Sequence, residues 1–214
     1  MPVEIVEYQK NYREYVRHIC FETGFAGRSL EGIIDNKNLF LDLSTHYFLD
    51  ANYGVTFIAK NNEIPAGYIF VSMNKRQYDR FQKEYYKKRL AIEIFSFHYF
   101  TGRDFKYYSA LASSYLKGDF ESPEMPDYPA LIHINTDPSY HGIGIGKMMM
   151  NKAFEYLGVE NCPGVQLRTT SLNVNALAFF QKMGFTKLYS RPASFYNKYG
   201  FKDAENLIFG KKLD

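Results

Sequence analysis

Apolar and polar positions alternate along some stretches of the chain and repeat at helical spacing along others. Alternation with a period of two predicts β-strands, and apolar residues three and four positions apart predict amphipathic helices. The predicted strands cover residues 3–8, 54–60, 66–72, 130–135 and 165–170. The predicted helices cover residues 11–22, one or two segments within 30–49, and residues 77–90, 147–156 and 173–183. This order of elements predicts an α/β fold with a mixed sheet: a strand and helices come first, then a hairpin, then alternating strands and helices that end in a last strand.

No stretch of the chain is long or polar enough to separate two domains, so we predict a single domain over residues 1–214. A long segment, residues 75–129, interrupts its alternation of strands and helices. Within it, residues 77–90 carry aromatic side chains at helical spacing among Lys and Arg, and residues 92–116 are again rich in aromatic side chains. Basic residues on such a helix usually form a solvated face, whereas a long insertion is often functional, as a lid bordering a pocket would be.

Composition narrows the class of protein. With 46% hydrophobic residues and a net charge of +3, the chain can bury a core and lacks the excess of positive charge typical of nucleic-acid binding. No apolar run approaches the roughly 20 residues of a membrane span. The acidic N-terminus has no hydrophobic signal region, so we expect a cytoplasmic protein. Cys20 and Cys162 show no metal or redox spacing, and we expect free thiols and no metal.

The stretch 133–150 combines a strand end, a glycine-rich turn and a helix start. Gly142, Gly144 and Gly146 lie where the first backbone amides of the helix have no intrahelical partner, so a pyrophosphate can accept their hydrogen bonds. A Walker A loop needs Ser or Thr in place of Met148, and a dinucleotide-binding fingerprint needs two residues before its third glycine. The turn therefore predicts a phosphate-bearing ligand of another kind.

Two segments resemble the signatures of the GNAT N-acetyltransferase superfamily. The run from Pro138 to Gly146 is similar to its pyrophosphate loop, Arg/Gln-x-x-Gly-x-Gly/Ala, with His141 at the Arg/Gln position. The run from Asn173 to Phe185 is similar to Asn-x-x-Ala-x-x-x-Tyr-x-x-x-Gly-Phe, with Phe180 at the Tyr position. The resemblance covers residues 130–188 and implies the GNAT fold, a mixed sheet that splays between its fourth and fifth strands and is flanked by helices. The insertion 75–129 then lies between the third and fourth strands.

This resemblance implies acetyl-coenzyme A as co-substrate. Its pantetheine arm would pair with the end of the fourth strand, its pyrophosphate would lie on the glycine turn, and the second signature would contact its sulfur end. The residues so predicted to bind the coenzyme are Ile134, Asn135, Thr136, His141, Gly142, Ile143, Gly144, Ile145, Gly146, Lys147, Asn173, Phe179 and Phe180.

The resemblance further implies acetyl transfer to the primary amine of a small molecule or peptide. An amine with a pKa near 10 must lose a proton to react. His133 is the first candidate base, although strand alternation leaves open whether it faces the core. Glu22, in the turn after the first helix, is the second candidate. Because phenylalanine cannot donate a proton, Tyr196 or Tyr199 is the candidate to replace the acid missing at Phe180.

Residues 18–28 and 127–135 look like those of bacterial acetyltransferases related to the acetyltransferase-like domain of protein O-GlcNAcase. That group reads His-x-His-x-Asp along the fourth strand, where this chain has Leu131, His133 and Asn135. The O-GlcNAcase-attached domain is regarded as a pseudo-acetyltransferase, so the alternatives are a coenzyme-binding module without turnover and a purely structural domain. We expect the insertion and residues 191–199 to border the acceptor side of the splay. The competing interpretation is that the insertion enlarges the core or makes a homodimer contact.

Overall fold

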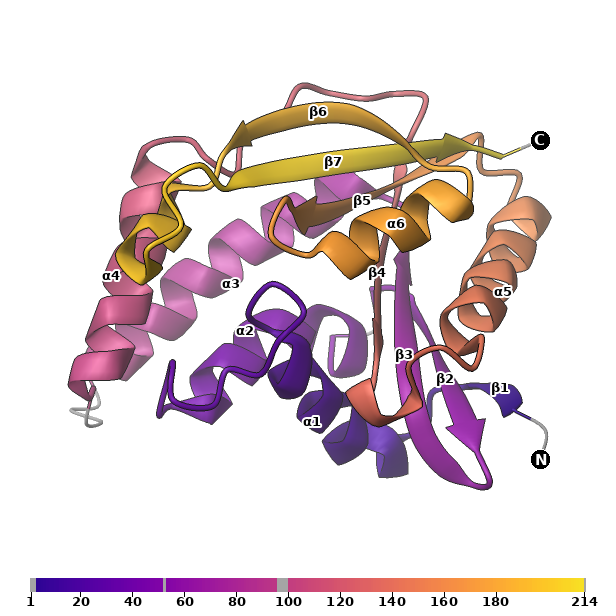
Figure 1. The fold of residues 1–214 in the computed structure, drawn as a ribbon, viewed down its shortest axis with the longest axis horizontal. Coiled ribbons are helices and arrows are strands. Elements are labelled where there is room, and N and C mark those ends of the chain that lie inside the picture. The colour runs from indigo at the N-terminus through magenta and orange to yellow at the C-terminus, as the bar shows by residue number, and fades with distance from the viewer. Residues whose placement is uncertain (1–2, 52, 96–99, 214) are drawn as a thin grey trace.

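Among the residues that the structure describes, seven strands form one sheet in the order β1-β2-β3-β4-β5-β7-β6 (Figure 1). The structure is a computed structural model, and it describes residues 3–51, 53–95 and 100–213. The strands are β1 (Val3–Glu7), β2 (Val55–Asn61), β3 (Ile64–Ser72), β4 (Ala130–Thr136), β5 (Gly164–Thr170), β6 (Thr186–Pro192) and β7 (Glu205–Lys212). Neighbours are antiparallel except β4 and β5, which are parallel. The predicted mixed α/β fold is confirmed.

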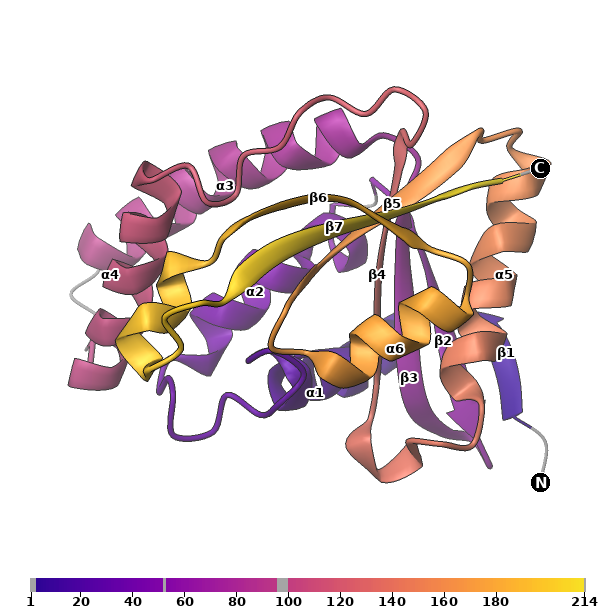
Figure 2. The same ribbon diagram turned by 45° about the horizontal axis from the view of Figure 1, so that its top comes forward.

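Helices cover both faces of the sheet (Figures 1 and 2). They are α1 (Arg13–Thr23), α2 (Lys37–Leu49), α3 (Lys75–Phe95), α4 (Gly102–Leu116), α5 (Ile145–Val159) and α6 (Val174–Lys182). Helix α5 packs on β1 to β4, and α1 packs on β3 and β4. Successive residues of β3 point to opposite faces, so Tyr68 and Phe70 join the core under α1 and α2, whereas Ile69 and Val71 join the core under α5.

Local sequence explains where several elements begin and end. The turn of the β2–β3 hairpin places Asn62 and Glu63 at positive φ, 52° and 66°, the geometry of the two-residue turns that suit a twisted hairpin. Asn173 caps α6 by accepting a hydrogen bond from Ala176 N at 3.3 Å. Gly184, with φ of 83°, follows this helix and turns the chain into β6.

Two boundaries differ from the sequence prediction. Helix α5 begins at Ile145, two residues earlier than expected, because Gly144 adopts φ of 89° and acts as its N-cap. After α6 the chain forms β6 and β7 instead of one last strand. Strand β6 lies at the edge of the sheet and is partly exposed along its length, so it lacks the apolar alternation that identifies a covered strand.

The insertion 75–129 consists of α3, α4 and the segment that returns to β4. Helix α3 packs on α2, and α4 packs on the 3₁₀ helix η3 (Ser194–Tyr199). Asp42 of α2 joins α1 to α3, because its carboxylate accepts from Arg17 at 2.9 Å and from Arg89 at 3.2 Å. Residues 96–99 of the aromatic-rich segment 92–116 lie outside the described residues.

Two sequence expectations concern the chain as a whole. Cys20 and Cys162 are free and buried. Over the described residues, no helix is both long and apolar enough to cross a membrane.

Candidate functional site

The sheet opens between β4 and β5. These strands pair at Ala130 with Val165 and at Leu131 with Gln166, and no further pairing joins them in the described part of the chain. Strand β4 is buried over its first three residues and becomes accessible from His133 onward. From that point one edge of β4 has no strand partner, which leaves backbone groups available to an extended ligand.

The glycine turn, residues 142–146, lies next to this opening. Gly142 and Gly144 have φ of 85° and 89°, and a Cβ built on either would meet no atom within 4 Å. No side chain caps α5. The first amides of the helix therefore face open space at the positive end of its dipole, a position that favours an anion.

A groove of about 680 Å³, here called the glycine-turn groove, runs from this turn to the opening in the sheet. It brings together all the predicted coenzyme-binding residues except Ile143, whose side chain is 55% exposed and lies outside the lining. The lining also contains residues that were not predicted to bind the coenzyme: Thr23, Gly27, Tyr140, Asn175, Ala176, Lys182 and Met183. Among these residues, Lys182 has the clearest signal, because its positive charge adds to that of Lys147 near the glycine turn.

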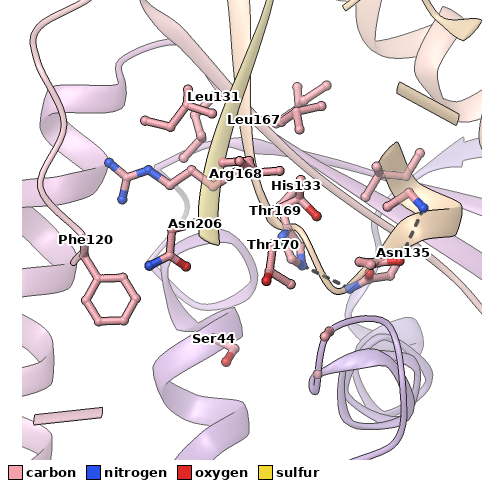
Figure 3. A pocket seen from close by; sticks show the side chains of 18 of the residues that line it. Ser44, Phe120, Leu131, His133, Asn135, Leu167, Arg168, Thr169, Thr170 and Asn206 are labelled. Atoms are coloured by element: carbon pink, nitrogen blue, oxygen red, sulfur yellow. Dashed lines mark hydrogen bonds between the residues drawn. The ribbon is translucent and has the colours of Figure 1, made fainter. Parts of the chain in front are cut away.

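A second cavity of about 420 Å³, the central pocket, lies on the other side of the opening (Figure 3). Both cavities are lined by Thr23, Gly27, Ile134, Asn135, Asn173, Ala176 and Phe180, so they meet where β4 and β5 diverge. The insertion contributes Tyr78, Gln82, Tyr86, Asp119, Phe120 and Glu121 to the central pocket. The C-terminal segment contributes Tyr189, Arg191, Tyr196, Asn206, Leu207 and Ile208. The insertion and the tail thus border this side of the opening.

His133 faces the central pocket and is exposed there, not packed in the core (Figure 3). Its Nε2 lies 3.0 Å from Asn135 Nδ2, which also donates to Tyr68 Oη at 2.7 Å. With Nδ2 as donor to both, Nε2 is an acceptor and the imidazole proton is on Nδ1. Protein surrounds the ring on the sides that do not open into the pocket, and this desolvation lowers the pKa of His133 to about 4. The imidazole is neutral at physiological pH.

The other predicted catalytic residues are placed differently. Glu22 lies within the last turn of α1, not in the turn after it, and its side chain lines neither cavity. Helical spacing directs its neighbour Thr23 toward the site instead. Tyr196 lines the central pocket, and burial raises the pKa of its hydroxyl to about 12 against the opposing effect of a hydrogen bond with Thr170. Tyr199 is half-buried beside it and lines neither cavity.

The central pocket contains polar residues that sequence reasoning missed, among them Ser44, Gln82, Arg168, Thr170 and Asn206. They come from α2, α3, β5 and β7, and most carry no motif. Arg168 offered one signal, because it is the one charged residue of the β5 segment and stands where β5 leaves β4.

Comparisons with known proteins agree with this geometry. The profile of the acetyltransferase (GNAT) family matches residues 29–185. The crystal structure of SsHAT has a TM-score of 0.72 at 21% identity, with 100% of both chains covered. An acetyltransferase from Bacillus anthracis str. Ames, assigned to streptothricin and solved in complex with acetyl coenzyme A, has a TM-score of 0.56 at 15% identity over 100% of both chains.

A third similar structure is a ribosomal-protein-alanine N-acetyltransferase from Brucella melitensis. Its TM-score is 0.56 at 12% identity, with 98% of this chain and 99% of that chain covered. At these identities the likeness to the solved structures concerns the fold.

Proposed function

This chain belongs to the GNAT family of acetyltransferases, and we propose that it transfers the acetyl group of acetyl-coenzyme A to the nitrogen of a primary amine. One observation carries the proposal: the glycine-turn groove and the central pocket meet at the splay between β4 and β5. A coenzyme in the groove then presents its thioester to an acceptor in the pocket.

The groove fits the coenzyme chemically. The open amides at Gly144 and the start of α5 suit its pyrophosphate, and Lys147 and Lys182 add positive charge. The free edge of β4 at Ile134 to Thr136 suits the amides of the pantetheine arm. The Bacillus anthracis structure, which holds acetyl coenzyme A on the same fold, supports this assignment.

The reaction needs positioning and two proton transfers. The amine nitrogen attacks the thioester carbonyl carbon, the carbon–sulfur bond breaks, and the products are an amide and the free thiol of coenzyme A. Nitrogen becomes acidic once it has bonded to the carbonyl carbon. His133 is neutral and exposed to the pocket, so it can take that proton after releasing Asn135 from Nε2. Tyr196 keeps its proton at neutral pH and supplies it to the leaving thiolate.

A second function, coenzyme binding without turnover, is favoured by Phe180. This side chain is 6% exposed, borders both cavities and has no proton to donate. The resemblance to the acetyltransferase-like domain of O-GlcNAcase, which we keep as a proposal, supports the same alternative.

Two measurements separate these functions. Acetyl-coenzyme A raises the melting temperature in both cases, whereas only an enzyme releases free thiol when amines are supplied. Binding should be lost in Gly144→Glu, which puts a carboxylate where the pyrophosphate lies. The matched control is Gly32→Glu, because Gly32 also has a positive φ and open space at its Cβ but lies outside the groove. Both variants bear a strain of about 1–3 kcal/mol, so equal coenzyme affinity in the two would refute the site.

A further inference from the structure

Building on the function proposed above, we propose that the acceptor amine carries an oxyanion, a carboxylate or a phosphate, at its far end, and that Arg168 binds this anion in the central pocket. Among the described residues, four charged side chains line the pocket. Two are arginines, Arg168 and Arg191, and two are acids, Asp119 and Glu121.

The two arginines have different surroundings. Arg191 is fixed in the pocket wall, since Nε donates to Tyr189 Oη at 2.9 Å and Nη1 donates to Gly118 O at 2.8 Å. Among the described residues, Arg168 has one hydrogen-bond contact, with Ser122 Oγ at 3.4 Å, and one ion-pair contact, with a carboxylate oxygen of Asp79 at 3.6 Å. Both distances exceed the roughly 2.8 Å of a charge-assisted hydrogen bond.

Asp79 also has a nearer cation. Its carboxylate lies 2.5 Å from Lys75 Nζ, which belongs to the same helix. The charge of Asp79 is thus shared, and Arg168 can bind a further anion without breaking a short ion pair. A guanidinium presents paired N–H donors that match the two oxygens of a carboxylate or phosphate.

The acids of the pocket offer little to a second ammonium group. Asp119 is 5% exposed, and its Oδ2 accepts from Ser194 N at 2.8 Å, from Ser194 Oγ at 2.5 Å and from the Ser114 hydroxyl. The side chain of Glu121 is 75% exposed and lies 3.7 Å from Arg191. Asp119 therefore has its partners already, and the charge of Glu121 is screened by solvent, so neither acid favours a second ammonium group at the far end of the pocket.

The position of Arg168 defines the shape of the acceptor. In Figure 3 its side chain extends away from His133 and Asn135, toward the side of the pocket where Phe120 lies. Asn135 marks the junction with the glycine-turn groove, where the amine must meet the thioester. Thr169, Thr170 and Asn206, which are uncharged, lie between these two ends (Figure 3). An elongated molecule with an amine at one end and an oxyanion at the other fits this arrangement.

The test measures thiol release with four series of straight-chain amines of equal length: ω-amino carboxylates, ω-aminoalkyl phosphates, α,ω-diamines and ω-amino alcohols. The first two series separate the two oxyanions. We expect an oxyanion series to have the highest kcat/KM. Arg168→Gln should lower that value about tenfold to a hundredfold, mainly through KM, and leave the amino alcohols within about twofold. Arg168→Lys should restore part of the loss.

The control is Arg76→Gln, which removes an exposed arginine from α3 outside the pocket and should change none of these values. Unchanged acetyl-coenzyme A affinity and melting temperature show that Arg168→Gln is folded. The proposal is overturned if the diamines are the best substrates, or if Arg168→Gln affects all series alike.

Failure of turnover is a separate outcome. If no amine releases thiol, calorimetric binding of the amino carboxylate and the aminoalkyl phosphate to the coenzyme A-saturated protein decides the anion site. Binding that Arg168→Gln abolishes supports the site while refuting catalysis, and binding that is absent or unaffected refutes the site.

Discussion

Phe180 occupies the position at which the GNAT signature has a proton-donating tyrosine. The ring lies at the junction of the two cavities, packed near Phe185 and Phe209, and contributes apolar surface there. The tail offers a substitute, because Tyr196 lines the central pocket that Phe180 borders. Single residues thus decide whether the fold catalyses or only binds.

The two tail tyrosines form a matched pair. If Tyr196 protonates the thiolate, Tyr196→Phe should lower kcat about a hundredfold with unchanged coenzyme affinity. Tyr199→Phe should leave kcat unchanged and keep or slightly raise stability, because its buried hydroxyl has no partner among the described residues. Steady-state kinetics and thermal melting of both variants test this, and equal kcat in the two would remove Tyr196 from the mechanism.

The lowered pKa of His133 predicts how the free energy of unfolding depends on pH. Its pKa falls from the usual 6.5 to about 4 on folding, so between these values the unfolded chain binds a proton that the folded chain does not. This residue therefore makes the free energy of unfolding decrease as pH falls below 6.5, until the folded protein is protonated near pH 4. Denaturant unfolding of His133→Gln should show a smaller decrease over that interval. An identical pH dependence in wild type and variant would contradict the desolvation argument.

At the scale of elements, the insertion is held to the core by carboxylates. Asp104 in the first turn of α4 forms a capping box with Thr101, and its Oδ1 accepts from Asp35 N and Asn36 N, both at 2.9 Å. Asp119 accepts from Ser194 and so joins the segment after α4 to η3. Because the segment after α4 and η3 both line the central pocket, the shape of this wall depends on the carboxylate of Asp119.

Asp104→Ala should destabilise the fold by about 1–3 kcal/mol, because it leaves the partly buried N–H groups of Asp35 and Asn36 without this acceptor. Burial alone would raise the pKa of this carboxyl, but hydrogen bonds to its charged form outweigh burial and hold the pKa below 3.8. Its contribution is therefore present above that pH and is lost as pH falls through the lower folded value. Urea unfolding against pH should show the difference from wild type shrinking in acid. The control is Asp203→Asn, at an exposed position, which should leave the free energy of unfolding equal to that of wild type.

At the scale of the whole molecule, the sheet has two parts that pair at two positions between β4 and β5 in the described structure. In the first part, α1, α2 and α5 pack on strands among β1 to β4. In the second part, β5 to β7, the ring of Phe209 of β7 lies near Phe180 of α6. Loops also cross the opening: Gly27, with φ of 84°, approaches so closely that a Cβ there would lie 2.7 Å from the Asn173 amide. A ligand in the opening therefore contacts both parts.

Acetyl-coenzyme A should slow amide hydrogen exchange in both parts, at residues 132–136 of β4 and at residues 174–177 of α6. At a concentration about 100 times its Kd, it should stabilise the fold by about 2.7 kcal/mol. Inorganic pyrophosphate alone should protect the start of α5 and leave β4 unchanged. Exchange followed by mass spectrometry tests this, and protection confined to one part would show that the ligand does not lie in the splay.

The sequence by itself determined the features that depend on neighbouring residues. The order of strands and helices, the cap at Asn173 and the glycine turn before α5 all follow from local spacing and backbone preference. The turn and the second signature also predicted most of the lining of the glycine-turn groove, because they are continuous segments whose local conformation carries the contacts. Ile143 was the exception: the run around it predicts the turn but not which side chain faces outward.

Only the tertiary structure decided the central pocket. Its wall combines Tyr86 of the insertion, Arg168 of β5 and Asn206 of β7, which no local pattern relates. Alternation along β4 fixed which residues share a face with His133, but not whether that face is covered. The face that carries His133 is open because β5 diverges from β4 after the pair Leu131–Gln166. That divergence arises from the packing of separate segments against each other. The acceptor end of the site was therefore beyond the sequence, since burial and charge pairing there depend on contacts between distant parts of the chain.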